Sequence, residues 1–166
     1  MTQDTPALLA CLAEAGVEFI VIGGVAALAH GSAVFTRDLD VMISFEPTSL
    51  QRVLSALGPL APRFAGPTDQ AVPTDASALA GFRNLYVETK LGRIDFLGST
   101  PIGDYATLIA RSEWMAIAGV EVRVVALADL IAIKHALGRP KDKLVEAELR
   151  AIQERIAAIS PPGEGG

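Results

Sequence analysis

The segment from Gly23 to Asp40 joins a glycine turn to two carboxylates that are separated by one residue. It follows the apolar run 17–22, which is typical of a buried strand, and it leads into a second strand predicted over 38–44. Side chains alternate faces along a strand, so Asp38 and Asp40 are expected on one face, about 6.6 Å apart along the chain. Two such carboxylates repel unless a cation lies between them. A hard divalent ion, bound by carboxylates and substrate phosphates, is the usual solution.

Length and composition indicate a folded protein. The 166 residues are 51% hydrophobic with a mean hydropathy of +0.39, which is enough to build a buried core. Polar residues or glycine interrupt each apolar run, and the first residues do not read as a leader, so we expect a cytoplasmic protein with no membrane span. The formal net charge of −5 excludes a broad electrostatic surface for nucleic acid but permits a local basic pocket.

The remaining pattern alternates helices and strands. We predict one domain over 1–160, with an α/β core over 1–125, C-terminal helices over 126–160 and a disordered tail over 161–166. Residues 59–77, rich in proline, are predicted to form a loop that lies over the site. Predicted helices cover 4–16, 25–30, 46–57, 105–110 and 127–137, with another from 140; predicted strands cover 17–22, 38–44, 82–88, 93–97, 115–117 and 120–125.

Asp95 is the best candidate for a third carboxylate. It lies between Ile94 and Phe96, which should face the core and leave Asp95 on the opposite face with Arg93. Burying a carboxylate in an apolar strand is costly unless it is paired or metal-bound. The Asp95 carboxylate could therefore belong to a metal site shared with Asp38 and Asp40, form an ion pair with Arg93, or cap a turn.

Gly23 and Gly24 also allow two interpretations. A phosphate could approach the exposed backbone there, or the two glycines could simply make a tight turn from strand to helix. The sequence contains neither a P-loop nor a Gly-x-Gly-x-x-Gly fingerprint.

Taken together, these motifs resemble the nucleotidyltransferase superfamily with the DNA polymerase β-like fold. Within it the chain resembles small bacterial nucleotidyltransferases related to AbiEii-type abortive-infection and toxin–antitoxin proteins. The resemblance rests on Gly23-Gly24, Asp38-x-Asp40 and Asp95, and on the C-terminal segment from Ala128 to Asp142. It departs at Val34, where relatives often carry arginine.

The resemblance implies an α+β fold, with a mixed sheet flanked by helices and a C-terminal helical extension. It implies a transferase that uses Mg²⁺ or Mn²⁺ and moves a nucleoside monophosphate from an NTP such as ATP to a hydroxyl of an RNA, a protein or a small molecule, with a toxin-type role and an antitoxin-like protein partner among the options. Asp38, Asp40 and Asp95 would bind metal and catalyse, while Gly23 and Gly24 would contact phosphate.

Lys134 lies among apolar positions of its predicted helix, so its ammonium must either reach solvent along the surface or meet an anion. The resemblance suggests the nucleotide triphosphate as that anion. The competing function is a non-catalytic protein that keeps this fold and binds a partner. The absent arginine at Val34 and the small size favour it, whereas the retained carboxylates oppose it.

Overall fold

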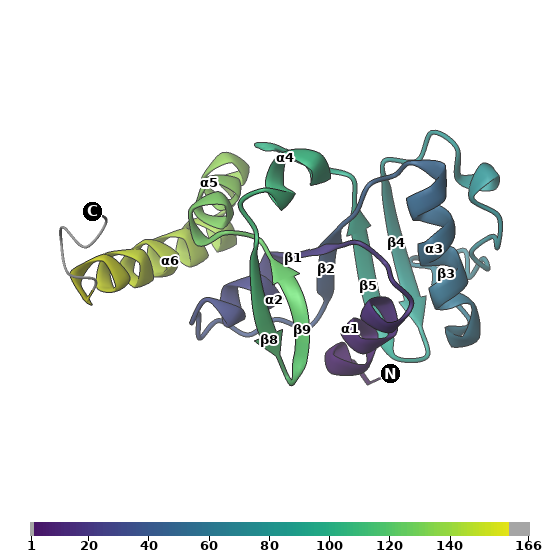
Figure 1. Ribbon diagram of the computed structural model, residues 1–166, viewed down its shortest axis with the longest axis horizontal. Helices are drawn as coiled ribbons and strands as arrows, with labels where there is room; N and C mark the ends of the chain where they lie inside the picture. Colours follow the sequence, from purple (N-terminus) through teal and green to yellow (C-terminus); the bar gives the residue numbers. More distant parts are fainter. Residues whose placement is uncertain (1, 160–166) are drawn as a thin grey trace.

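The computed structural model describes residues 2–159, and its centre is a seven-stranded sheet in the order β3-β4-β5-β2-β1-β9-β8 (Figure 1). The sheet is mixed, because β1 is antiparallel to β2 but parallel to β9, and β2 is parallel to β5. A separate two-stranded ribbon follows β5. The strands are β1 (Ile20–Ile22), β2 (Leu39–Met42), β3 (Arg63–Phe64), β4 (Asn84–Thr89), β5 (Gly92–Leu97), the ribbon strands β6 (Ser99–Thr100) and β7 (Gly103–Asp104), β8 (Glu113–Ile117) and β9 (Val120–Val124).

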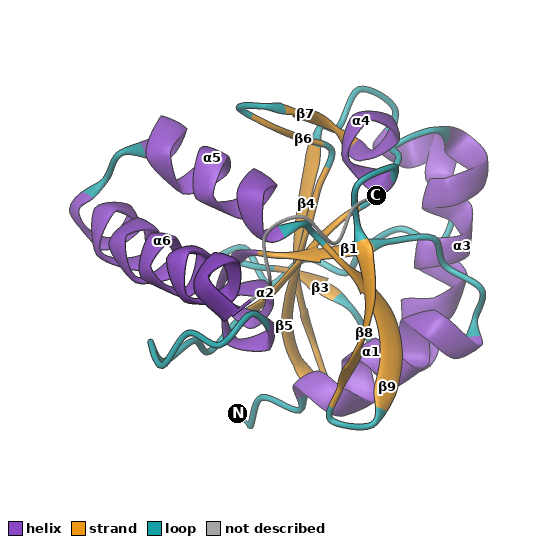
Figure 2. Ribbon diagram, turned by 60° about the vertical axis from the view of Figure 1, so that its left-hand side comes forward, coloured by secondary structure: helices purple, strands orange, loops and turns teal. Residues whose placement is uncertain are grey.

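Helices cover both faces of the sheet (Figure 2). On one face lie α1 (Thr5–Glu14) and α3 (Pro47–Leu57), and on the other lie α2 (Gly23–Ala29), α5 (Leu127–Leu137) and α6 (Pro140–Ile159). The short helix α4 (Tyr105–Ile109) follows the ribbon, and the 3-10 turns η1 (Gly58–Leu60) and η2 (Ala76–Leu79) flank β3. This arrangement confirms the predicted α+β class with C-terminal helices. Within residues 2–159 no helix has both the length and the apolar character needed to cross a bilayer.

Local sequence signals explain where the helices begin and end. Asp4 caps α1 by accepting a hydrogen bond from the Ala7 backbone N–H at 3.1 Å. Gly138 ends α5 in the left-handed conformation (φ 62°), and Pro140 then begins α6. These two residues turn the chain back sharply, so α5 and α6 pack as a helical hairpin.

The strand alternation separates a core face from a polar face. Leu39 and Val41 of β2 and Ile94 and Phe96 of β5 are fully buried in the core beneath α1 and α3. Their neighbours therefore project from the opposite face, toward α5. That Asp95 lies opposite the core was predicted from the sequence. One row of Cα partners runs across the sheet on this face, from Ile22 through Asp40 and Asp95 to Tyr86.

The structure corrects the prediction for residues 59–77. These residues do not form a loop over the site: Arg63 and Phe64 pair with β4 as the edge strand β3, and η2 packs against α3. The free edge of β4 has unpaired backbone N–H and C=O groups, which a short segment of almost any sequence can pair with. Two residues are enough to form such an edge strand, so the sequence shows no alternating pattern that would predict it. The strands predicted over 17–22 and 38–44 are shorter in the structure, because β1 and β2 pair over only three residues, although Val17 and Phe19 are buried.

The other predicted elements are present, with bounds that differ by a few residues. Helix α2 begins at Gly23 rather than at Val25. The predicted tail over 161–166 lies outside the described residues, and α6 is described to Ile159.

Candidate active site

The sheet topology brings the three predicted carboxylates together. Asp40 lies in the middle of β2, its Cα partner on β5 is Asp95, and Asp38 immediately precedes β2. All three line one hollow of about 400 Å³. Because β2 and β5 are adjacent and parallel, their outward side chains share one face, which the sequence pattern could not show without the pairing.

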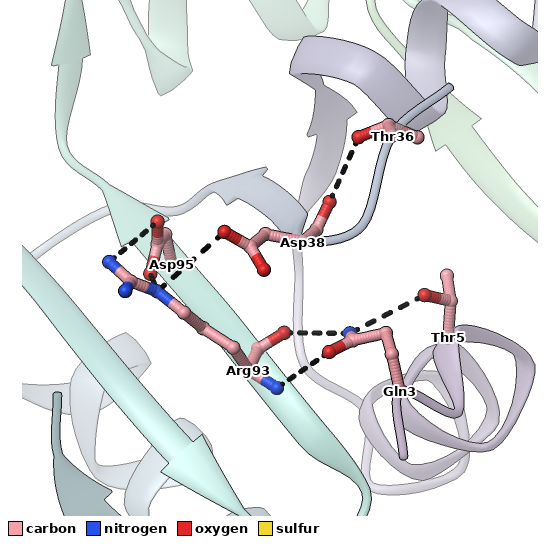
Figure 3. A network of polar contacts seen from close by, with 6 residues as sticks. All are labelled: Gln3, Thr5, Thr36, Asp38, Arg93 and Asp95. Carbon is pink, nitrogen blue, oxygen red and sulfur yellow. Dashed lines mark hydrogen bonds and ion pairs between the residues drawn. The ribbon is translucent and has the colours of Figure 1, made fainter. Parts of the chain in front are cut away.

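Arg93 already supplies a cation to two of these carboxylates (Figure 3). Its Nε lies 3.0 Å from Asp95 Oδ1 and 3.9 Å from Asp38 Oδ2. The backbone of Arg93 is held in turn by Gln3, whose side-chain amide donates to the Arg93 carbonyl and accepts from its N–H, each at 2.8 Å. The pair between Asp95 and Arg93, one of the alternatives from the sequence, is therefore present in the structure.

Asp40 has a different environment. Burial, and then repulsion by Asp95 and Asp38, raise its pKa to about 6, while the charge of Lys134 acts in the opposite direction. The carboxylate is ionised at neutral pH against this repulsion. A cation placed beside Asp40 would relieve it.

A divalent ion is compatible with these residues in its donor chemistry. Carboxylate oxygens are the protein ligands that Mg²⁺ and Mn²⁺ prefer, and Asp40 is repelled by the carboxylates of Asp95 and Asp38. Among residues 2–159, however, no three His, Cys, Asp or Glu side chains are gathered tightly enough to form a metal centre by themselves. Asp38, Asp40 and Asp95 can therefore supply part of a coordination shell that substrate oxygens and water would complete.

Gly23 and Gly24 make room for the site. Gly23 has φ +67°, and a Cβ atom there would collide with the Asp40 carboxylate; a Cβ on Gly24 would collide with the Thr36 side chain. The two glycines thus allow the start of α2 to pass directly against β2 and the segment that precedes it. This supports the tight-turn interpretation, and Gly23 also lines the hollow with the three carboxylates.

Lys134 contacts an anion that belongs to the chain itself, whereas its predicted contact with a nucleotide triphosphate stays a prediction. Its Nζ lies 3.4 Å from Oδ1 of Asp142, a fully buried carboxylate on α6. Arg139 also pairs with Asp142, at 2.5 Å from Nε to Oδ2, and its backbone N–H donates to the same oxygen. Burial opposes ionisation of Asp142, but Arg139 and Lys134 outweigh it and hold the pKa of this carboxyl below its usual value.

The sequence analysis missed Asp142 as a site residue. Its position in the first turn of a helix that begins at Pro140 is typical of a solvated cap, and only the packing of α5 on α6 buries it. The sequence did contain a signal for this role of Asp142. It follows Arg139 by three residues and Lys134, which lies on the apolar side of its helix, by eight.

Two hollows meet at the carboxylates and share Asp38, Asp40, Lys134, Arg139 and Lys141. The first, here called the β4 hollow, is the one that Asp95 lines, and it also reaches Tyr86 of β4 and α5. The second, here called the loop hollow, has a volume of about 460 Å³ and lies against the segment 32–38 and the start of α6, with Phe35, Arg37 and Leu144 in its wall.

Glu148 of α6 anchors the segment that forms the loop hollow. Its carboxylate accepts hydrogen bonds from the Ser32 hydroxyl and, at 2.9 Å, from the Ala33 N–H. These contacts hold the pKa of Glu148 below its usual value. Val34 follows directly and lines this hollow together with Arg37.

His30 and Cys11 make structural contacts away from the carboxylates. His30 Nε2 is 2.8 Å from the Val125 carbonyl, and Cys11 packs against the core with its thiol directed to the Ala56 carbonyl.

No family model matches the chain, and no curated protein matches its sequence. Its fold is similar to that of a lincosamide antibiotic adenylyltransferase, LnuA, crystallised with lincomycin, with a TM-score of 0.63 and 12% identity over 90% of this chain and 96% of that one. A Thermotoga maritima crystal structure described as a nucleotidyltransferase gives 0.51 and 13% over 92% and 97%. The solution structure of the antibiotic-resistance factor ANT(2'')-Ia gives 0.50 and 17% over 95% and 96%. These likenesses show that the chain has the nucleotidyltransferase fold.

Proposed function

We propose that this protein is a metal-dependent nucleotidyltransferase, which moves a nucleoside monophosphate from an NTP to a hydroxyl group. The observation that carries the proposal is the meeting of Asp38, Asp40, Asp95 and Lys134 around one hollow, in a fold shared with nucleotidyltransferases. Carboxylates and an ammonium on opposite walls suit a metal-bound triphosphate, which carries both signs of charge.

In the proposed reaction the acceptor oxygen forms a bond to the α-phosphorus, and the bond from this phosphorus to the bridging oxygen of pyrophosphate breaks. The electron pair of that bond leaves with pyrophosphate, and the proton of the acceptor hydroxyl passes to the Asp95 carboxylate. Bound Mg²⁺ or Mn²⁺ would neutralise charge that develops on the phosphate oxygens. Asp38 and Asp40 would hold the ion on the side of the triphosphate, and Asp95 on the side of the acceptor.

The residues of this chain contribute mainly position and charge. Lys134, oriented by Asp142, would contact the triphosphate, and Gly23 and Gly24 would let phosphate come close to the backbone. Arg93 must then release Asp38 and Asp95 when metal binds, and its guanidinium becomes free to meet an anion.

A double-label experiment tests the proposal. The protein is incubated with Mg²⁺ or Mn²⁺, total tRNA and cell lysate, and with each NTP labelled at either the α- or the γ-phosphate. Nucleotidyl transfer moves only the α label to an acceptor and releases the γ label in pyrophosphate. Asp40→Asn should abolish transfer, whereas Asp69→Asn, on an exposed pair at the far edge of the sheet, should not. Transfer of the γ label would instead indicate a kinase.

One observation favours the alternative, a non-catalytic protein that binds a partner. Arg93 neutralises Asp38 and Asp95 without any metal, so the cluster is not left without a cation. Calorimetric titration of Mg²⁺ or Mn²⁺, with and without NTP, separates the two functions. A protein that binds neither ion nor nucleotide is not the proposed enzyme.

The relationship to AbiEii-type proteins, a toxin-type role and an antitoxin-like partner form a further part of this proposal. They rest on the sequence resemblance of Gly23-Gly24, Asp38-x-Asp40, Asp95 and the segment to Asp142. Expression of the parent and of Asp40→Asn in a bacterial host tests the toxin role, because only an active toxin slows growth in a way that the variant abolishes.

A further inference from the structure

The two hollows differ in charge once their shared residues are set aside. The loop hollow adds Arg37, a cation that pairs with no carboxylate among residues 2–159, and it adds Asp142, which is already paired. Among the same residues, the β4 hollow adds only one charged side chain, Asp95. A triphosphate carries several negative charges, so it suits the side with more cations. The shared Lys134, Arg139 and Lys141 lie between the two sides.

The walls of the β4 hollow are otherwise uncharged. Apolar side chains come from α5 and from the end of β5, and small hydroxyl groups come from the ribbon that follows. The lining residues of these kinds include Tyr86, Leu97, Ser99, Thr100, Leu130 and Ile133. Its volume of about 400 Å³ is that of a cavity for one small molecule.

Tyr86 gives this hollow an aromatic surface next to the reacting group. It is 43% exposed, it is the Cα partner of Asp95, and its neighbours Leu85 and Val87 are buried on the opposite face. The Tyr86 carbonyl accepts a hydrogen bond from Ala65 N–H at 2.9 Å, so the residue that follows the edge strand β3 holds the Tyr86 backbone in place. A half-exposed aromatic ring is a surface on which a planar or apolar ring can stack.

We propose that the β4 hollow binds the acceptor, and that the acceptor is a hydroxylated small molecule with a ring or apolar face and at most one positive charge. This inference rests on the proposed function and names the acceptor class that it leaves open. Tyr86 packs against the ring, the Ser99 hydroxyl is available to a polar substituent, and the reacting hydroxyl faces Asp95. The Thr100 hydroxyl is already bonded within the ribbon, to the Gly103 carbonyl and the Ile102 N–H. The loop hollow receives the nucleotide.

The charge distribution disfavours two other acceptor classes. A polyamine would meet Lys134, Arg139 and Lys141 and would find no carboxylate in the β4 hollow beyond those assigned to metal. An RNA end would bring phosphates to a wall whose own side chains, within the described residues, include no cation beyond the three that are shared with the nucleotide side.

The test compares acceptors of different charge in one assay. The protein with ATP labelled at the α-phosphate and Mg²⁺ is given p-nitrophenyl β-D-glucopyranoside as the neutral ring-bearing probe, tobramycin as the polycation, or total tRNA. We expect label on the neutral probe alone. Tyr86→Ala should raise KM for that probe about threefold to tenfold and leave KM for ATP within about twofold. Tyr86→Phe keeps the aromatic ring and should reverse most of the rise in KM for the probe that Tyr86→Ala causes.

Trp114→Ala is the matched control, because Trp114 is another exposed aromatic residue of the sheet, on β8 and outside both hollows. Label on tobramycin or tRNA, or a neutral probe that neither accepts label nor binds to the nucleotide-loaded protein in calorimetry, overturns the acceptor assignment. An equal effect of Tyr86→Ala and Trp114→Ala also overturns it. Failure of the proposed function is a separate result, since the protein would then bind no ATP with Mg²⁺.

Discussion

Asp40 is a partly buried carboxylate and Asp142 a fully buried one, and their electrostatic environments are opposite. Asp142, at the junction of α5 and α6, is paired with Lys134 and Arg139, and these ion pairs keep its pKa low. Asp40, in the central strand, faces two further carboxylates, and its pKa rises to about 6. A carboxylate that the chain itself neutralises supports the structure, whereas one that the chain leaves repelled is suited to bind a cation from outside.

The largest expected effect comes from removing the charge of Asp40. Asp40→Asn should lower transfer about a thousandfold or more, because a metal ligand is lost while the fold remains. Label transfer under saturating NTP measures this, with Asp69→Asn as the control. Asp38→Asn should act in the same direction. An Asp40→Asn protein that melts well below the parent in metal-free buffer would show instead that Asp40 is structural.

For Asp142 the same kind of change should act mainly on stability. Asp142→Ala leaves Lys134 and Arg139 without their common partner and should lower the free energy of unfolding by about 2–4 kcal/mol. Urea unfolding with and without the substitution measures this. The contrast with Asp40 fails if Asp142→Ala unfolds at the same urea concentration as the parent.

The pH dependence of stability should carry the signature of Asp40. Its pKa is about 6 in the folded protein and about 3.9 in an unfolded chain, so the folded state holds the proton more tightly. Stability should therefore fall as pH rises from about 4 through 6, by at most about 3 kcal/mol for this group. The Asp40→Asn variant has no titrating group at this position, so its stability should not fall in this way. In EDTA its urea midpoint should be clearly higher than that of the parent at pH 7.5, and only slightly higher at pH 4.5.

Lys134 lies between the two carboxylates, because it pairs with Asp142 and also lowers the repulsion at Asp40. Lys134→Met keeps an apolar stem of similar length and removes the charge. We expect NTP with Mg²⁺ to bind about tenfold more weakly in calorimetry, the effect of losing one charge-assisted contact. Lys143→Met, an exposed lysine of the same helical hairpin, is the control. Unchanged affinity would restrict Lys134 to its pair with Asp142.

How far the sequence predicts this molecule depends on whether a signal is local. Alternation along β5 was enough to place Ile94 and Phe96 in the core and Asp95 opposite them, and glycine and proline were enough to separate α5 from α6. The Asp38-x-Asp40 spacing also predicted two neighbouring carboxylates, which line one hollow although Asp38 lies just before β2.

Features that depend on packing between distant segments were not predictable in this way. The burial of Asp142 requires α5 to lie against α6, and the edge strand β3 exists only because β4 has a free edge. The sequence places Tyr86 on the exposed side of a strand, but its position beside Asp95 follows only from the pairing of β4 with β5. The structural likeness confirms the fold, while the roles of the site residues remain predictions.

The position of β2 at the centre of the sheet, with β1 on one side and β5 on the other, also has a consequence for hydrogen exchange. Amides of β2 and β5 are bonded within the sheet and covered by the core, so they should exchange with deuterium only through global unfolding. The α5–α6 hairpin packs at the edge of this unit and should open locally at lower free energy. The negative wall of the site is thus expected to keep its geometry while the wall that carries Lys134 and Arg139 moves, so substrate can enter without disturbing the spacing of the carboxylates.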